Sequence, residues 1–169
     1  MTSKLLTALA AALLLAACSS TPEDTSATTG RGTSSTSSTT SGTTTAAVTP
    51  GSAAEFTQSV GDRVFFGYDS YELTPDAQST LERQATWLKT YPAVTIVVEG
   101  HCDERGTREY NLALGERRAA AVANYLVALG VDPNRIQTIS YGKERPAVDG
   151  HDETAWSQNR RGVTVPNVQ

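Results

Sequence analysis

A charged residue at a core position is the first chemical clue in this sequence. Arg118 lies four residues after Leu114 and four before Val122, so it shares one helix face with apolar residues. A guanidinium that faces a core is costly unless it is paired and hydrogen-bonded. We therefore expect Arg118 to have an anionic partner, whereas Arg117, rotated by about 100° around the helix, faces solvent.

Asp103 is the expected partner, because it lies in the loop between a predicted central strand and the helix of Arg118. Ligands of open α/β sheets often bind in crevices at such strand ends. The two charges could simply neutralise each other. They could equally hold a zwitterion, with Arg118 clamping a carboxylate and Asp103 accepting an ammonium. The free amino-acid end of diaminopimelate in cell-wall peptides has this pattern, and the residues alone leave both interpretations open.

Two enzymatic alternatives involve the residues next to Asp103. His101, Cys102 and Asp103 are metal-ligand types, and a metal-dependent hydrolase would need them to meet His151 and Asp152. Three consecutive residues do not converge readily on one ion. A Cys-His or Ser-His-Asp hydrolase is disfavoured because adjacent strand residues point to opposite faces. We therefore predict a binding protein that is not an enzyme, with no metal and no other cofactor.

The surrounding sequence predicts one folded domain over residues 55–169. Thr74 and Pro75 form a helix start, and apolar residues recur every three or four positions after them. The run 94–99 is β-branched and apolar, which predicts a strand buried on both faces. Helices are predicted at 75–90, 109–129 and 153–159, and strands at 63–66, 94–99, 136–141 and 162–165. The alternation favours an α/β class (an α+β sandwich), with a small mixed sheet of about four strands and helices packed mainly on one face.

The first 54 residues are predicted to serve export and spacing. Lys4 and an apolar run of about 13 residues are typical of a signal peptide, here 1–17, and are too short to span a bilayer. Leu15-Ala16-Ala17-Cys18 is similar to a lipobox, which predicts cleavage before Cys18 and its acylation. Ser19 favours sorting to the outer membrane. Residues 18–54 form a predicted disordered tether with an r.m.s. span of about 30–36 Å.

Composition excludes two further classes of function. The net charge of −4 comes without a basic cluster, so a nucleic-acid partner is not expected. Cys102 is the only cysteine besides Cys18, so no disulfide framework is expected within the chain.

Several motifs together resemble the OmpA-like C-terminal domain family, and the lipobox and tether resemble its lipoprotein members. The motifs are Gly100-His101-Cys102-Asp103-Glu104-Arg105-Gly106-Thr107, Tyr110-Asn111, Leu114-Gly115-Glu116-Arg117-Arg118-Ala119, Ser140-Tyr141-Gly142, Lys143-Glu144-Arg145-Pro146-Ala147-Val148, Gly150-His151-Asp152-Glu153 and Asn159-Arg160-Arg161. They extend over about 105 residues, nearly the whole predicted domain.

The resemblance implies a ligand site that holds the diaminopimelate of peptidoglycan stem peptides without a covalent bond. Asp103 and Arg118 match the residues that bind it, and Asn111 and Leu114 match residues of the same pocket. Tyr68 and Asp69 would add a wall, although Phe66-Gly67-Tyr68-Asp69 stands where relatives often have Phe-Asp-Phe-Asp. Arg160 and Arg161 could be extra phosphate or glycan contacts, but we expect them to be solvated or salt-bridged beside the last strand.

The resemblance also implies a place in the cell. The domain would face the periplasm from a lipid anchor in the outer membrane and would tether that membrane to the wall. It would belong to the Tol system, which supports envelope integrity and cell division, with the propeller protein TolB as a partner. The alternative is a domain that acts mainly as a TolB-binding module.

Overall fold

The computed structural model describes residues 48–168. The predicted signal peptide, Cys18 and residues 19–47 of the predicted tether lie outside this part of the chain. The elements follow in the order α1 (Ala53–Glu55), the π-helical turn η1 (Phe56–Val60), β1 (Arg63–Phe65), α2 (Pro75–Thr90), β2 (Thr95–His101), α3 (Arg108–Ala128), the 3-10 turn η2 (Pro133–Arg135), β3 (Ile136–Gly142), α4 (Glu153–Asn159) and β4 (Arg161–Asn167).

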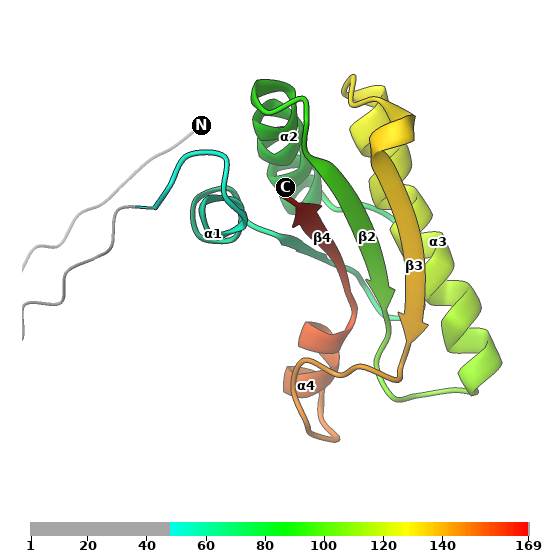
Figure 1. Cartoon of the computed structure of the whole chain (residues 1–169). Coiled ribbons are helices and arrows are strands. Elements are labelled where there is room, and N and C mark those ends of the chain that lie inside the picture. Colours follow the sequence, from blue (N-terminus) through cyan, green and yellow to red (C-terminus); the bar gives the residue numbers. More distant parts are fainter. Residues whose placement is uncertain (1–47, 169) are drawn as a thin grey trace, which may run out of the picture. The chain divides into compact units, whose positions relative to one another are not determined.

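The four strands form one mixed sheet in the order β1-β4-β2-β3. β4 runs antiparallel to both of its neighbours, whereas β2 and β3 are parallel. The long helices α2 and α3 lie together on one face of this sheet (Figure 1). The predicted fold class, a small mixed sheet with helices mainly on one face, is therefore confirmed.

The core lies between the sheet and these two helices. Ile96 and Val98 of β2 face the helices and are 1% and 0% exposed, whereas the alternate residues Val97 and Glu99 are only partly buried. The prediction that β2 is buried on both faces is wrong, because α2 and α3 cover only one face. An antiparallel neighbour on one side allows this half-covered arrangement.

Two glycines bring α3 close to the end of β2. A Cβ atom on Gly100 would lie 1.8 Å from the carbonyl oxygen of Gly115, and a Cβ on Gly115 would lie 2.3 Å from the Oγ of Ser140. Only glycine fits at both positions. The close approach places Arg118, one helical turn after Gly115, over the point where β2 ends.

An N-terminal turn packs against α2 before the sheet begins. The Ser52 side chain caps α1, and the Glu55 carboxylate accepts hydrogen bonds from the Gly51 amide and the Trp87 indole, each at 2.7 Å. Phe56 is fully buried and meets the Trp87 ring edge-on at 4.8 Å. Folded structure therefore begins before residue 55, the predicted start of the domain. The Ser-x-x-Glu spacing of a capping box is the signal for it.

Within residues 48–168, no helix combines the length and the apolar character that crossing a membrane requires.

Candidate ligand-binding site

A cavity of about 230 Å³ lies beside the first half of α3, where the loops that follow β1 and β2 meet. Each of the six residues predicted to bind ligand lines it: Tyr68, Asp69, Asp103, Asn111, Leu114 and Arg118. Cys102, Arg105, Gly106, Tyr110 and Arg160 complete the lining. A larger cavity of about 570 Å³ beside β1 and the start of α2 contains none of the predicted site residues.

Arg118 is fully buried and is held by backbone carbonyls. Its Nε donates to Ser70 O at 2.8 Å, its Nη1 to His101 O at 2.8 Å and its Nη2 to Gly67 O at 3.0 Å. Among the described residues, no carboxylate oxygen lies within 4.0 Å of its nitrogens. The expected ion pair between Arg118 and Asp103 is therefore not formed, and backbone carbonyls hold the guanidinium instead. Three of its five N–H groups donate to carbonyls, and the side chain also forms part of the cavity lining.

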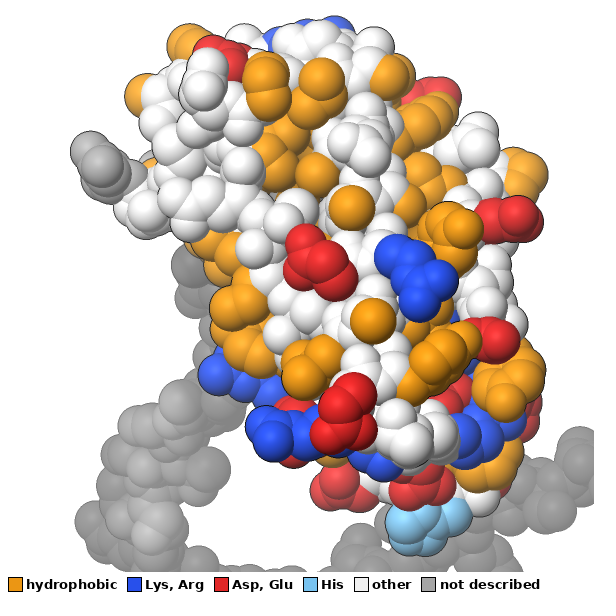
Figure 2. Space-filling model, turned by 90° about the vertical axis from the view of Figure 1, so that its right-hand side faces the viewer, with side chains coloured by type: hydrophobic (Ala, Val, Ile, Leu, Met, Phe, Trp, Pro, Cys, Tyr) orange, Lys and Arg blue, Asp and Glu red, His pale blue; other side chains and the backbone are white. Residues whose placement is uncertain are grey.

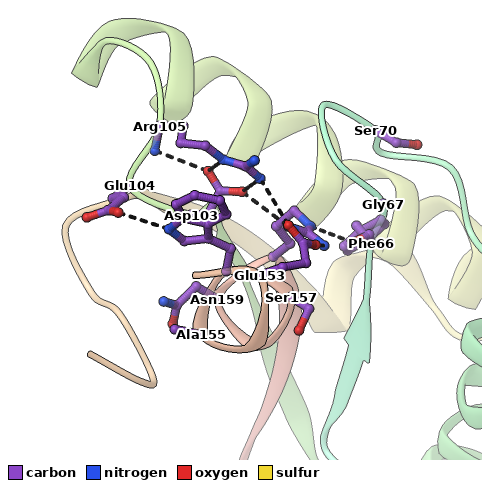
Figure 3. Close-up of polar contacts among 12 residues, drawn as sticks. Phe66, Gly67, Ser70, Asp103, Glu104, Arg105, Glu153, Ala155, Ser157 and Asn159 are labelled. Atoms are coloured by element: carbon purple, nitrogen blue, oxygen red, sulfur yellow. Dashed lines mark hydrogen bonds and ion pairs between the residues drawn. The ribbon is translucent and has the colours of Figure 1, made fainter. Parts of the chain in front are cut away.

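Asp103 is 5% exposed and is held by two other arginines, of which Figure 3 labels Arg105. Arg105 donates to it from its backbone N–H at 3.1 Å, from Nε at 3.2 Å and from Nη2 at 2.5 Å. Arg160 Nη1 adds a contact at 3.4 Å. Burial raises the pKa of the Asp103 carboxyl, but the Arg105 hydrogen bonds and charge outweigh burial and leave that pKa below its ordinary value. Asp103 is therefore ionised at neutral pH.

Arg105 forms part of the cavity rim, where two aromatic rings enclose its guanidinium. The guanidinium carbon lies 4.2 Å from the centre of the Tyr68 ring and 4.1 Å from that of Trp156. Such stacking holds a cation in place while part of it stays in water. Figure 2 shows acidic and basic side chains gathered at this end of the domain, beside an exposed histidine.

Arg160 and Arg161 are buried, with 6% and 7% exposure. Arg160 forms salt bridges with Asp103 and Glu153, which was one of the expectations for it. It forms them in the wall of the cavity. Arg161 donates only to backbone carbonyls, those of Asn159 at 3.4 Å and Arg145 at 3.2 Å. Neither residue is solvated, and Arg160 is a member of the cavity lining that the sequence did not predict.

Asn111 and Tyr110 present polar groups from the first turn of α3. The Asn111 amide donates to Arg105 O at 2.7 Å and to Thr107 O at 2.9 Å, which uses both N–H groups. Its Oδ1 accepts no hydrogen bond among the described residues and is left as an acceptor. The Tyr110 hydroxyl donates to Asp69, whose backbone has a left-handed φ of 52°. Aspartate tolerates that conformation, so Asp69 is fixed at the cavity mouth.

The residues of the enzymatic alternatives lie apart. The His101 ring stacks on Tyr141 at 5.5 Å, with Nε2 3.3 Å from Glu99, whereas the Cys102 thiol donates to Asn111 O at 3.4 Å. Burial is the main reason that the pKa of Cys102 is raised. His151 pairs with Glu104 at 2.7 Å. Within residues 48–168, no three His, Cys, Asp or Glu side chains are grouped so that they could hold a metal ion.

Comparison with known proteins is consistent with this geometry. Residues 65–160 match the OmpA family. The peptidoglycan-associated lipoprotein of Rhizobium meliloti is 62% identical over 117 residues, which cover 69% of this chain and just under two thirds (66%) of that protein. The protein of the same name from Haemophilus influenzae is 53% identical over 100 residues, covering 59% of this chain and 65% of its own.

Solved structures have the same fold. The crystal structure of the peptidoglycan-associated lipoprotein from Burkholderia pseudomallei has a TM-score of 0.65 at 42% identity, covering 69% of this chain and all of that one. The C-terminal domain of Helicobacter pylori MotB has a TM-score of 0.60 at 25% identity, covering 64% and 85%. The family match includes every cavity residue from Tyr68 to Arg160. The chain belongs to the OmpA family, and relatives at 53–62% identity are peptidoglycan-associated lipoproteins.

Proposed function

We propose that the cavity binds the free amino-acid end of diaminopimelate in peptidoglycan stem peptides. The observation that carries the proposal is that Arg118 and Asp103 line one small cavity with opposite charges, from separate elements. The Arg118 guanidinium would bind a ligand carboxylate, and Asp103 and Asn111 Oδ1 would accept from its ammonium. The relatives are named peptidoglycan-associated lipoproteins, which supports peptidoglycan as the source of the ligand.

Binding of this kind is reversible, because it involves hydrogen bonds and charge and forms no covalent bond. The backbone carbonyls that hold Arg118 and the arginines that hold Asp103 fix both charges before a ligand arrives. A preorganised site loses little ordering entropy when it binds. The protein would thus tether the outer membrane to the wall while either can still move past the other.

We propose further that an acylated Cys18 anchors the protein in the outer membrane, with the domain in the periplasm. Cys18 lies outside the described residues, and support comes from the lipobox and from the lipoprotein names of the relatives. Several acyl chains give stable anchoring where one is marginal. Mass spectrometry of the mature N-terminus tests this anchor: an unmodified Cys18, or cleavage at another position, would refute it.

Co-sedimentation with purified peptidoglycan sacculi tests the ligand site. Asp103→Asn keeps the shape of the side chain and removes its charge, so we expect the affinity to fall at least about tenfold, as for a lost hydrogen bond to a charged group. Arg117→Gln is the control, because Arg117 is an exposed arginine on the same helix. Circular dichroism must show that both variants are folded. If folded Asp103→Asn sediments like the wild type, the site assignment is wrong.

TolB is proposed as a protein partner at the same face, within the Tol-Pal system that supports envelope integrity and cell division. Two tyrosines of the cavity lining are strongly exposed, Tyr68 at 66% and Tyr110 at 45%, and Tyr71, three residues after Tyr68, is 46% exposed. Tyrosine is enriched in protein interfaces. A shared face predicts that purified TolB and peptidoglycan fragments compete for the protein. Simultaneous binding of both would refute the shared face and would leave the peptidoglycan site unaffected.

A further inference from the structure

The two arginines that contact Asp103 differ in how firmly they are held. The Arg105 side chain is 30% exposed and extends from the same loop as Asp103 to the cavity rim. The Arg160 side chain is 8% exposed and reaches Asp103 from the end of α4. Figure 3 shows the carboxylate of Asp103 facing the side chain of Arg105. A ligand ammonium that enters from solvent meets Arg105 first.

Arg160 has one orientation because each of its donor groups has a separate acceptor. Its Nε donates to Phe66 O at 3.1 Å, at the end of β1, and its Nη2 donates to Glu153 on α4. Its Nη1 faces Asp103 at 3.4 Å. Arg160, the C-cap of α4, therefore joins that helix to the end of β1 and to the Asp103 loop. Moving it away from Asp103 would break its hydrogen bonds to Phe66 O and Glu153.

We propose that Arg160 is a positioning residue for the ligand site, the permanent counter-ion that keeps Asp103 ionised and oriented when a ligand ammonium replaces Arg105. The inference rests on the proposed function for its ligand. An ammonium and the Arg105 guanidinium repel each other and compete for the same two oxygens. Arg105 is the partner that can leave, because its side chain is partly exposed and its guanidinium can rotate towards the solvent. The buried carboxylate then depends on Arg160 to offset the cost of burying its charge.

Other ionisable groups around Asp103 set the background for any pH measurement. They come from its own loop, from α3, from the loop after β1 and from α4, and they are Cys102, Glu104, Arg105, Tyr110, Arg118, Tyr68, Asp69 and Glu153. None of them is substituted in a variant of Arg160, but Glu153 loses its ion pair with Arg160 in Arg160→Gln. Arg160→Lys, which keeps the positive charge, is therefore compared with Arg160→Gln.

The test is calorimetric titration of the Ser19–Gln169 chain with the tripeptide L-Ala-γ-D-Glu-meso-diaminopimelate between pH 4 and pH 7. In Arg160→Gln the acidic limb of binding should move to higher pH, so that affinity at pH 4.5 falls about tenfold more, relative to pH 7, than in the wild type. Arg160→Lys keeps the charge and should restore most of the wild-type pH profile. Arg161→Gln is the matched control, because Arg161 is equally buried but contacts only carbonyls.

The Asp103 carboxyl can also be followed without ligand, by NMR of its carboxyl carbon over a range that extends below pH 4, because the pKa of this carboxyl in the wild type is below its ordinary value. The titration should move to higher pH in Arg160→Gln and stay in place in Arg161→Gln. If it moves but no chain binds the tripeptide, Arg160 positions Asp103 and the proposed ligand is wrong. If Arg160→Gln keeps both wild-type profiles, or if Arg161→Gln shifts them equally, Arg160 has only a structural role and the inference is wrong.

Discussion

Asp103 and Arg118 line one cavity without forming an ion pair with each other. Arg118 donates to three backbone carbonyls, and Asp103 accepts from two other arginines. Each charge is therefore held by groups other than its opposite. A zwitterion can therefore contact both Asp103 and Arg118 without breaking an ion pair between these two residues.

Arg118 should contribute strongly to stability as well as to binding. In Arg118→Leu three carbonyls of the buried network lose their donor, so we expect the free energy of unfolding to fall by about 3 kcal/mol or more. Urea denaturation followed by circular dichroism measures it. Arg117→Leu, at the exposed neighbour, should change the same quantity by less than about 0.5 kcal/mol. Equal effects of the two substitutions would show that the carbonyl bonds of Arg118 contribute little.

Gly100 should tolerate no side chain. The methyl group of Gly100→Ala would lie 1.8 Å from the backbone of Gly115, so α3 would have to move away from β2. We expect a loss of about 3 kcal/mol in unfolding free energy, or no folding. At Gly67 the nearest atom to an added Cβ is 3.6 Å away, so Gly67→Ala is the control and should change stability little. A stable Gly100→Ala variant would contradict the close approach.

The N-terminal turn should be part of the cooperative domain. Phe56→Ala removes a fully buried ring that packs on Trp87, and should lower the free energy of unfolding by about 3–4 kcal/mol. Phe65 on β1 is 47% exposed and offers a matched control, since Phe65→Ala should cost clearly less. Thermal unfolding of both variants measures the difference. Similar losses would mean that the turn is only loosely attached.

Acid should destabilise the domain through His101. Burial, and then the charge of Arg161, lower the pKa of His101 to about 4, whereas an unfolded histidine titrates near 6.5. Because the folded pKa is the lower one, the stability from neutral His101 is complete above about pH 6.5 and is lost as pH falls towards 4. Between pH 7 and pH 4.5 the wild type should lose about 2 kcal/mol more than His101→Gln.

The measurement is urea denaturation at both pH values for both chains. The pKa of Asp103 is lowered, so the contribution of its carboxylate to the free energy of unfolding is lost only at lower pH, when the carboxylate is protonated. This contribution is the same in both chains. An identical pH dependence in the two chains would show that His101 is not buried in its neutral form.

Most of the fold could be predicted because local signals agree with the tertiary structure. Thr74 and Pro75 start α2, and the predicted span 153–159 coincides with α4. Burial on the second face of β2 could not be predicted, since an apolar β-branched run looks the same whether one or two layers cover it. The N-terminal turn was not predicted, because α1 has only three residues, too few to show a helical pattern, and follows a Ser/Thr-rich segment.

The location of the candidate site could be predicted from one residue, because burying the charge of Arg118 in a core would cost free energy. Arg118 stands among apolar residues, and the structure buries it in the expected place. Its partners were not predictable, because backbone carbonyls have no signature in a sequence. Arg160 is 57 residues from Asp103 along the chain, and only the pairing of β4 between β1 and β2 brings the two together.

The packing of Phe56 on Trp87 determines how mechanical load enters the domain. This turn precedes β1, a strand that pairs with β4 over only three residues and continues into the loop whose carbonyls hold Arg118. A pull on the chain before Val48 must detach the turn from α2 before any force reaches β1. The segment that yields first contributes no residue to the cavity. In the proposed tether, tension between membrane and wall would therefore lengthen the connection before it acted on the ligand site.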